Sequence, residues 1–100
     1  IAYGQAIHGR LVVDDGARKA LLIEGKSLLP SGILEVFGDF ELGEMVVIED
    51  CCGNEFARGL VNYSAPELTK VKGLRTEKAA EVLQRVCSEA VHRNNMVVKK

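Results

Sequence analysis

The segment from Gly9 to Ile33 constrains the fold more than any other part of the chain, because the backbone must turn twice within it. The apolar run Leu11–Val13 predicts a buried strand. Asp14 or Asp15 follows directly and can cap a helix by accepting a hydrogen bond from a free backbone N–H. The pattern therefore predicts a strand that passes through a tight turn into a helix.

The helix in this segment is short. Its small apolar residues recur at helical spacing from Ala17 to Leu21. Gly25 stands where a left-handed residue would end the helix. Leu29–Gly32 predicts a turn, with proline at its second position and glycine at its fourth. A second strand is expected to begin at Ile33.

The middle of the chain predicts three strands: Ile33–Phe37, Met45–Glu49 and Glu55–Tyr63. The first shows little polar alternation, so we expect both of its faces to be covered and Phe37, like Phe56, to lie in the core. Asp50–Asn54 has the composition of a hairpin connection. Gly59 inside a strand predicts a bulge or a close backbone approach.

The last part of the chain predicts two helices and a closing strand. Ser64–Glu67 has the pattern of a capping box, and the helix that it opens is expected to end at Gly73. Thr76 can cap a further helix, and Asn94–Asn95 predicts a turn before a final strand at Met96–Val98. The apolar stripe expected on that further helix comprises Ala79, Ala80, Leu83, Val86 and Cys87.

Together these elements predict a mainly β fold, a mixed, mostly antiparallel small barrel with short helices, the first of which plugs one end. A chain of 100 residues makes one domain. We expect residues 9–100 to form it, with residues 1–8 as the remainder of a linker or as an edge strand. No apolar run approaches the roughly 20 residues that a membrane span needs, so no membrane contact is expected.

The charge of the chain bears on nucleic-acid binding. Thirteen Lys and Arg stand against fourteen Asp and Glu, for a formal net charge of −1. Phosphate contacts dominate affinity for nucleic acid, and a dedicated binder carries a basic stripe. The balance argues against strong nonspecific RNA binding and leaves room for a local basic patch.

The three cysteines, Cys51, Cys52 and Cys87, fit neither a disulfide framework nor a zinc site, because their number is odd and no C-x-x-C pair occurs. We expect reduced thiols in a cytoplasmic protein. The alternative is that Cys51 and Cys52 form an exposed, redox-sensitive pair in a hairpin turn.

The sequence contains no evident catalytic constellation. Gly25-Lys26-Ser27 includes the G-K-S of a phosphate loop, but it falls at the end of a helix, where backbone carbonyls repel phosphate. His8 and His92 lack metal-ligand spacing. We therefore expect no catalytic, cofactor-binding or metal-binding residues in this chain.

Four segments resemble the PUA domain family, small pseudo-barrels named after pseudouridine synthases and archaeosine transglycosylases: Gly9–Ile33, Gly38–Glu44, Ala57–Ser64 and Ala90–Val97. Within this family, two motifs taken together, GKSLLPSGI at residues 25–33 and ARGLVNYS at residues 57–64, are similar to the branch at the C-terminus of bacterial glutamate 5-kinases. The last segment departs from the pattern at Asn94, where that branch usually has aspartate.

The resemblance implies a PUA-like pseudo-barrel that serves as a noncatalytic accessory or regulatory domain. An amino-acid kinase domain would precede it and hold ATP, Mg²⁺ and glutamate, making glutamyl 5-phosphate in the first step toward proline. The parent is expected to be a homo-oligomer. The alternative is an RNA-binding module of an RNA-modifying or translation-related protein.

The resemblance also points to candidate site residues. RNA-binding members of the family use a groove beside the first helix and an adjoining strand, which places Arg18, Lys19 and Lys26 there. Arg10 and Arg58 are weaker candidates for the same groove or for a docking surface.

Overall fold

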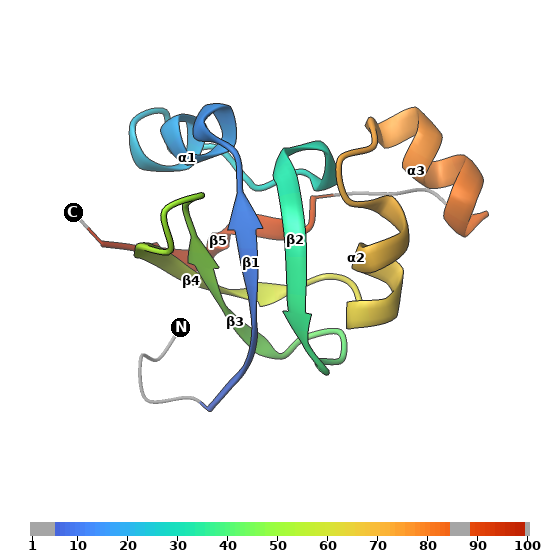
Figure 1. The fold of residues 1–100 in the computed structure, drawn as a ribbon, viewed down its shortest axis with the longest axis horizontal. Helices are drawn as coiled ribbons and strands as arrows, with labels where there is room; N and C mark the ends of the chain where they lie inside the picture. Colours follow the sequence, from blue (N-terminus) through green and yellow to red (C-terminus); the bar gives the residue numbers. More distant parts are fainter. Residues whose placement is uncertain (1–5, 85–88, 100) are drawn as a thin grey trace.

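The computed structural model describes residues 6–84 and 89–99. Within them, one mixed sheet has the strand order β2-β1-β3-β4-β5 (Figure 1). Its strands are β1 (Ile7–Val13), β2 (Ile33–Gly38), β3 (Met45–Glu49), β4 (Glu55–Val61) and β5 (Val91–Val98). Only the pair β1–β3 is parallel, and the other three neighbouring pairs are antiparallel. The predicted mainly β, mixed fold is confirmed.

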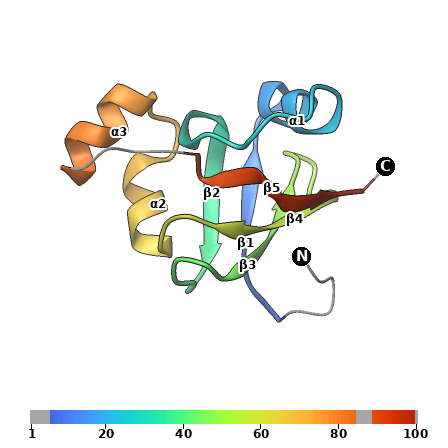
Figure 2. The same cartoon turned by 180° about the vertical axis from the view of Figure 1, so that it is seen from behind.

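The described residues also form three short helices and one 3₁₀ turn: α1 (Asp15–Leu22), η1 (Pro30–Gly32), α2 (Ala65–Val71) and α3 (Thr76–Leu83). Helix α1 lies across the end of the sheet where β1 stops, and α2 and α3 lie on the side of β2 (Figures 1 and 2). Lys72 Nζ, directly after α2, is 3.3 Å from Glu35 Oε2 on β2. The helices therefore cover one end and one side of the sheet.

The alternation of side chains along the strands decides which face is the core. Paired residues of adjacent strands form rows across the sheet. One row has Leu11, Ile48 and Ala57, all fully buried, at its centre, and its two end residues are half-buried. The next row crosses from Phe37 through Arg10, Val47 and Arg58 to Val97 and points the opposite way. Because neighbours along a strand face opposite sides, the charged row marks the outer face.

Local signals in the sequence fix the helix boundaries. The Asp14 carboxylate accepts a hydrogen bond from Ala17 N at 2.7 Å, which confirms the predicted cap of α1. Ser64 and Glu67 form the predicted capping box at the start of α2. Gly25 takes the expected left-handed conformation, with φ of +64°, but α1 ends earlier, at Leu22. The caps at Asp14 and Ser64 satisfy backbone N–H groups that a short helix leaves without partners.

Gly59 confirms the predicted close approach. The register between β4 and β5 shifts beside it, and a Cβ at this position would lie 2.5 Å from Val91 Cγ1 and 2.9 Å from Asn95 O. No side chain fits between the two strands here, so only glycine lets β5 pack closely on β4.

Three predictions about individual residues are wrong. Phe37 is 42% exposed on the outer face and not in the core, whereas Phe56 is buried as expected. Asn94–Asn95 lies inside β5 and does not form a turn before it. Arg75, not Thr76, occupies the N-cap of α3, and no side chain caps that end.

The bounds of several elements also differ from the prediction. Strand β1 begins at Ile7, four residues before the predicted start, and Ile7 pairs with Met45 of β3, whereas pairing with β2 starts at Gly9. Helix α2 ends at Val71, before Gly73. Val86 and Cys87, predicted for the stripe of α3, lie outside the described residues, as do residues 1–5.

Candidate functional site

The predicted site residues divide between two surfaces. Arg18 and Lys19 lie on α1 and Lys26 on the loop that follows it, whereas Arg10 lies on β1 and Arg58 on β4. The first three surround one end of the sheet and the last two share a row on its outer face. The structure thus forms two candidate surfaces where the sequence suggested one.

A groove of about 220 Å³ lies between α1 and η1, and it is called the α1 groove here. Ala17 and Leu21 of α1, Lys26 and Ser27 of the loop, and Ser31 of η1 are among its lining residues. It offers two hydroxyl groups and one ammonium group above an apolar floor, so it could accept a small polar group, but the carboxylate of Asp14 also lines it and opposes an anion.

The basic residues of this region are partly neutralised by carboxylates. Lys26 Nζ is 3.0 Å from Glu24 Oε1, and Arg18 Nε is 3.5 Å from Asp50 Oδ2. Lys19 is exposed and has no ion pair within the described part of the chain. Of the three predicted candidates, Lys19 therefore has the most unopposed charge.

Arg18 has a structural partner in the turn between β3 and β4. The Asp50 carboxylate is only 8% exposed and accepts hydrogen bonds from the backbone N–H groups of Cys52 at 2.9 Å and Asn54 at 3.0 Å. The Asn54 N–H above all, with Cys52 and Arg18 adding to it, lowers the pKa of Asp50. Arg18 thus connects α1 to this turn, and its guanidinium lies 5.9 Å from the centre of the Phe56 ring.

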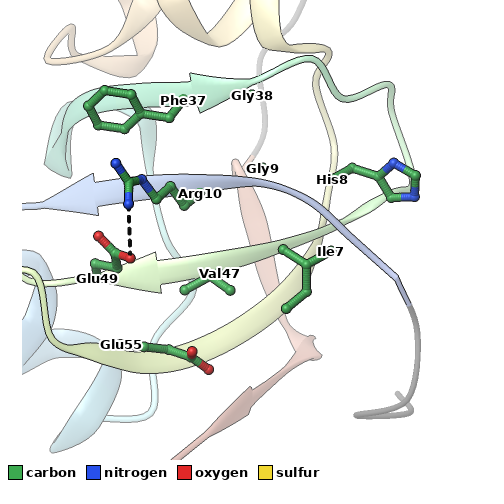
Figure 3. A pocket seen from close by; sticks show the side chains of 9 residues that line it. All are labelled: Ile7, His8, Gly9, Arg10, Phe37, Gly38, Val47, Glu49 and Glu55. Carbon is green, nitrogen blue, oxygen red and sulfur yellow. Dashed lines mark ion pairs between the residues drawn. The ribbon is translucent and has the colours of Figure 1, made fainter.

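The second surface is a groove of about 450 Å³ on the outer face of the sheet, called the outer-face groove here (Figure 3). Four strands contribute to it, and its lining includes Ile7, Arg10, Phe37, Val47 and Glu49. Arg10 projects between Phe37 and Glu49 (Figure 3). Its guanidinium carbon is 4.5 Å from the centre of the Phe37 ring, and its Nη1 is 3.8 Å from Glu49 Oε2.

The wall of the outer-face groove on β4 is also charged. Glu55 lines the groove, and Arg58 binds its carboxylate with Nε at 2.6 Å and Nη2 at 3.4 Å. Lys99 Nζ is 3.5 Å from the same carboxylate. The hydrogen bond from Arg58 lowers the pKa of Glu55. Arg10 and Arg58, which flank Val47 in one row, are therefore both paired with carboxylates.

Sequence reasoning missed several residues that shape these surfaces. Phe37 and Glu49 line the outer-face groove, and alternation from Arg10 across the paired strands leads to both. Glu55 also lines it, but alternation from Arg58 does not reach Glu55, because the register between β3 and β4 shifts after Ile48. Arg93 was also missed: its exposed backbone N–H donates to Ser27 Oγ at 2.8 Å and ties β5 to the α1 groove. No local signal predicts that contact, because the two residues are far apart in sequence.

The described residues show no arrangement for phosphotransfer. Gly25-Lys26-Ser27 follows the C-terminal end of α1, and Lys26 is engaged by Glu24, so this segment does not fit ATP phosphates. Within residues 6–84 and 89–99, no group of three or more His, Cys, Asp and Glu could hold a metal ion. No helix in the same part of the chain is long and apolar enough to cross a membrane.

The sequence matches the PUA domain family over residues 9–83. It is 42% identical over 99 residues to the glutamate 5-kinase of Thermoanaerobacter pseudethanolicus, covering 98% of this chain and 27% of that protein. The glutamate 5-kinase of Syntrophus aciditrophicus is 48% identical over 99 residues, and the match covers 98% of this chain and 26% of that protein. The chain thus spans about a quarter of the length of the curated relatives that it matches.

Solved structures share the fold at lower sequence identity. A PUA domain from Aeropyrum pernix, in a tartrate complex, has a TM-score of 0.66 and 24% identity, covering 86% of this chain and 41% of that chain. A chain of the archaeal box H/ACA sRNP Nop10-Cbf5 complex has a TM-score of 0.62 and 20% identity, and the match covers 93% of this chain and 24% of that chain. At such identities the likeness concerns the fold alone.

Proposed function

The chain belongs to the PUA domain family, and on that premise we propose that it is the noncatalytic accessory domain of a glutamate 5-kinase. That enzyme transfers the γ-phosphate of ATP to the side-chain carboxylate of glutamate, on the route to proline. The observation that supports the proposal is the similarity to glutamate 5-kinases, which extends over 98% of the chain and not over the PUA match alone.

On this proposal the chemistry belongs to an amino-acid kinase domain that precedes residue 1. ATP, Mg²⁺ and glutamate would bind there, and a homo-oligomeric, cytoplasmic parent is part of the same proposal. The PUA domain would then bias the state of the kinase domain through contacts that differ between two states, for example in feedback by proline.

A comparison of the full-length parent with this chain tests the proposal. We expect the parent to phosphorylate glutamate, detected as hydroxamate formation from glutamyl phosphate, and this chain to show no turnover under the same conditions. Phosphotransfer by the chain itself, or a parent with no activity on glutamate, would contradict the proposal.

RNA binding at the α1 groove is the second candidate function. Lys19 lies on α1 but does not line the groove, and its exposed, unopposed charge beside the groove favours RNA binding, as do the hydroxyl groups of Ser27 and Ser31 in the groove itself. The ion pairs of Arg18 and Lys26 weaken it, because those cations are already neutralised.

A salt titration separates the two candidates. If the α1 groove binds structured RNA, affinity at low salt should be high, and Lys19→Ala should reduce the slope of log K against log salt by about 0.9. Lys78→Ala is the matched control, because Lys78 lies on α3, away from the groove, and pairs with Glu81. No binding at low salt, or equal effects of both variants, would exclude this groove as the RNA site.

A further inference from the structure

The outer face of the sheet carries apolar surface that none of the described helices covers. Ile7 is 43% exposed and Phe37 is 42% exposed, and both line the outer-face groove around Val47. The helices lie at the end of the sheet and beside β2 (Figures 1 and 2). Exposed apolar side chains that line one groove are typical of surfaces that contact another protein.

The charges of this face point to a protein partner and away from nucleic acid. Arg10 pairs with Glu49, and Arg58 and Lys99 both pair with Glu55. A surface that binds a polyanion needs unopposed cations, whereas paired charges around an apolar centre match the polar rim and apolar core of a protein interface. Arg10 also stacks on Phe37, which holds both side chains at the edge of the groove.

The course of the chain places a partner next to this groove. Strand β1 begins at Ile7, and Ile7, His8 and Gly9 line the groove themselves. Any polypeptide N-terminal to β1 is therefore joined to the sheet at the groove. A domain tethered there has a high effective concentration at this surface, so a modest interface is enough to hold it.

We propose that the outer-face groove is the docking surface for the kinase domain that precedes this domain in the full-length protein. The inference rests on the proposed function. Docking covers Phe37 and Ile7 with apolar side chains of that domain and leaves the Arg10–Glu49 and Arg58–Glu55 pairs as the rim. Interfaces between domains of one chain bury about 600–1,500 Å², which is compatible with a contact centred on this groove.

Site-specific photo-crosslinking in the full-length protein tests the docking. The photoreactive residue p-benzoylphenylalanine replaces Phe37, which it resembles in shape, or in the control replaces Leu42. Leu42 is 63% exposed in the connection between β2 and β3 and does not line the groove. We expect the probe at position 37 to crosslink to peptides of the kinase domain, identified by mass spectrometry, and the probe at position 42 to give at most about one tenth of that yield.

Amide hydrogen exchange in the full-length protein gives a second measurement. Phe37→Asp places a charge in the contact, so the amides of residues 7–10 should exchange roughly tenfold faster than in the unsubstituted protein or in Leu42→Asp. Equal crosslinking at both positions, crosslinks from 37 to the groove of a second copy, or unchanged exchange in Phe37→Asp would overturn the docking. A full-length protein that docks in this way without phosphorylating glutamate would overturn the proposed function alone.

Discussion

Gly59→Ala should destabilise the domain, because β4 and β5 touch where the new methyl group would lie. The added Cβ would be 2.5 Å from Val91 Cγ1 and 2.9 Å from Asn95 O, over 1 Å short of ordinary contact with the methyl group. Overpacking of this kind lowers the free energy of unfolding by about 1–3 kcal/mol. The lower conformational entropy of the unfolded alanine variant offsets about 0.4–1 kcal/mol of that loss. We expect a net loss of about 1–2 kcal/mol in the free energy of unfolding.

Urea titration and thermal melting followed by circular dichroism measure this loss. For a domain of this size, a change of about 1–2 kcal/mol lowers Tm by roughly 4–16 °C. Gly16→Ala is the matched control: it lies in α1, its Cβ would contact only Asp14 Oδ1 at 3.4 Å, and its φ is not positive. The control should be neutral or slightly stabilising. A Gly59→Ala variant as stable as Gly16→Ala would refute the close approach of β4 and β5.

Three further predictions test local interactions. Ser64→Ala removes the cap of α2 and should lower the free energy of unfolding, measured by urea titration, by about 1 kcal/mol. Glu67→Gln is the control, because it keeps a carbonyl acceptor. No loss of stability in Ser64→Ala, or an equal loss in Glu67→Gln, would contradict the capping role. Because the folded state lowers the pKa of Asp50, its carboxylate stabilises the fold above the ordinary value of 3.8, and this contribution is lost as pH falls through the lower folded value. Asp50→Asn should therefore be less stable than the unsubstituted chain at neutral pH, with the difference shrinking below pH 3.8; a difference independent of pH would be inconsistent with this. The neighbouring carboxylate of Asp15 raises the pKa of Cys51, so Asp15→Asn should accelerate its alkylation by iodoacetamide at neutral pH, measured by mass spectrometry; an unchanged rate would rule out that electrostatic effect.

The sequence predicted best where a residue has one local physical role. Asp14 and Ser64 cap helices because their side chains reach backbone N–H groups two or three residues away. Gly25 takes a positive φ that other residues disfavour. Such interactions lie within a few residues, and no knowledge of the rest of the fold is needed to infer them.

The wrong predictions arise where pairing between distant segments overrides the local sequence pattern. In β2, Glu35 pairs with Val12 but Ile33 pairs with Val13, so Leu34 is an extra residue. This bulge lets Ile33 face the core although Glu35 and Phe37 face outward. The prediction that both faces of this strand are covered, which placed Phe37 in the core, was therefore wrong for the face that carries Phe37. A bulge depends on the partner strand, so the sequence of β2 alone does not reveal it.

The same limit applies to the candidate surfaces, because a count of charges does not say which are paired. Lys and Arg nearly equal Asp and Glu in this chain, which is compatible with isolated charges or with pairs. The fold places Arg10 and Arg58 in one row, each within 4 Å of a carboxylate, and leaves Lys19 exposed at the opposite end of β1. Paired charges around an apolar groove favour a protein contact, whereas an unopposed cation favours an anion. The charged row of the outer-face groove thus follows from strand register, and a register shift of one residue would exchange it for the buried row.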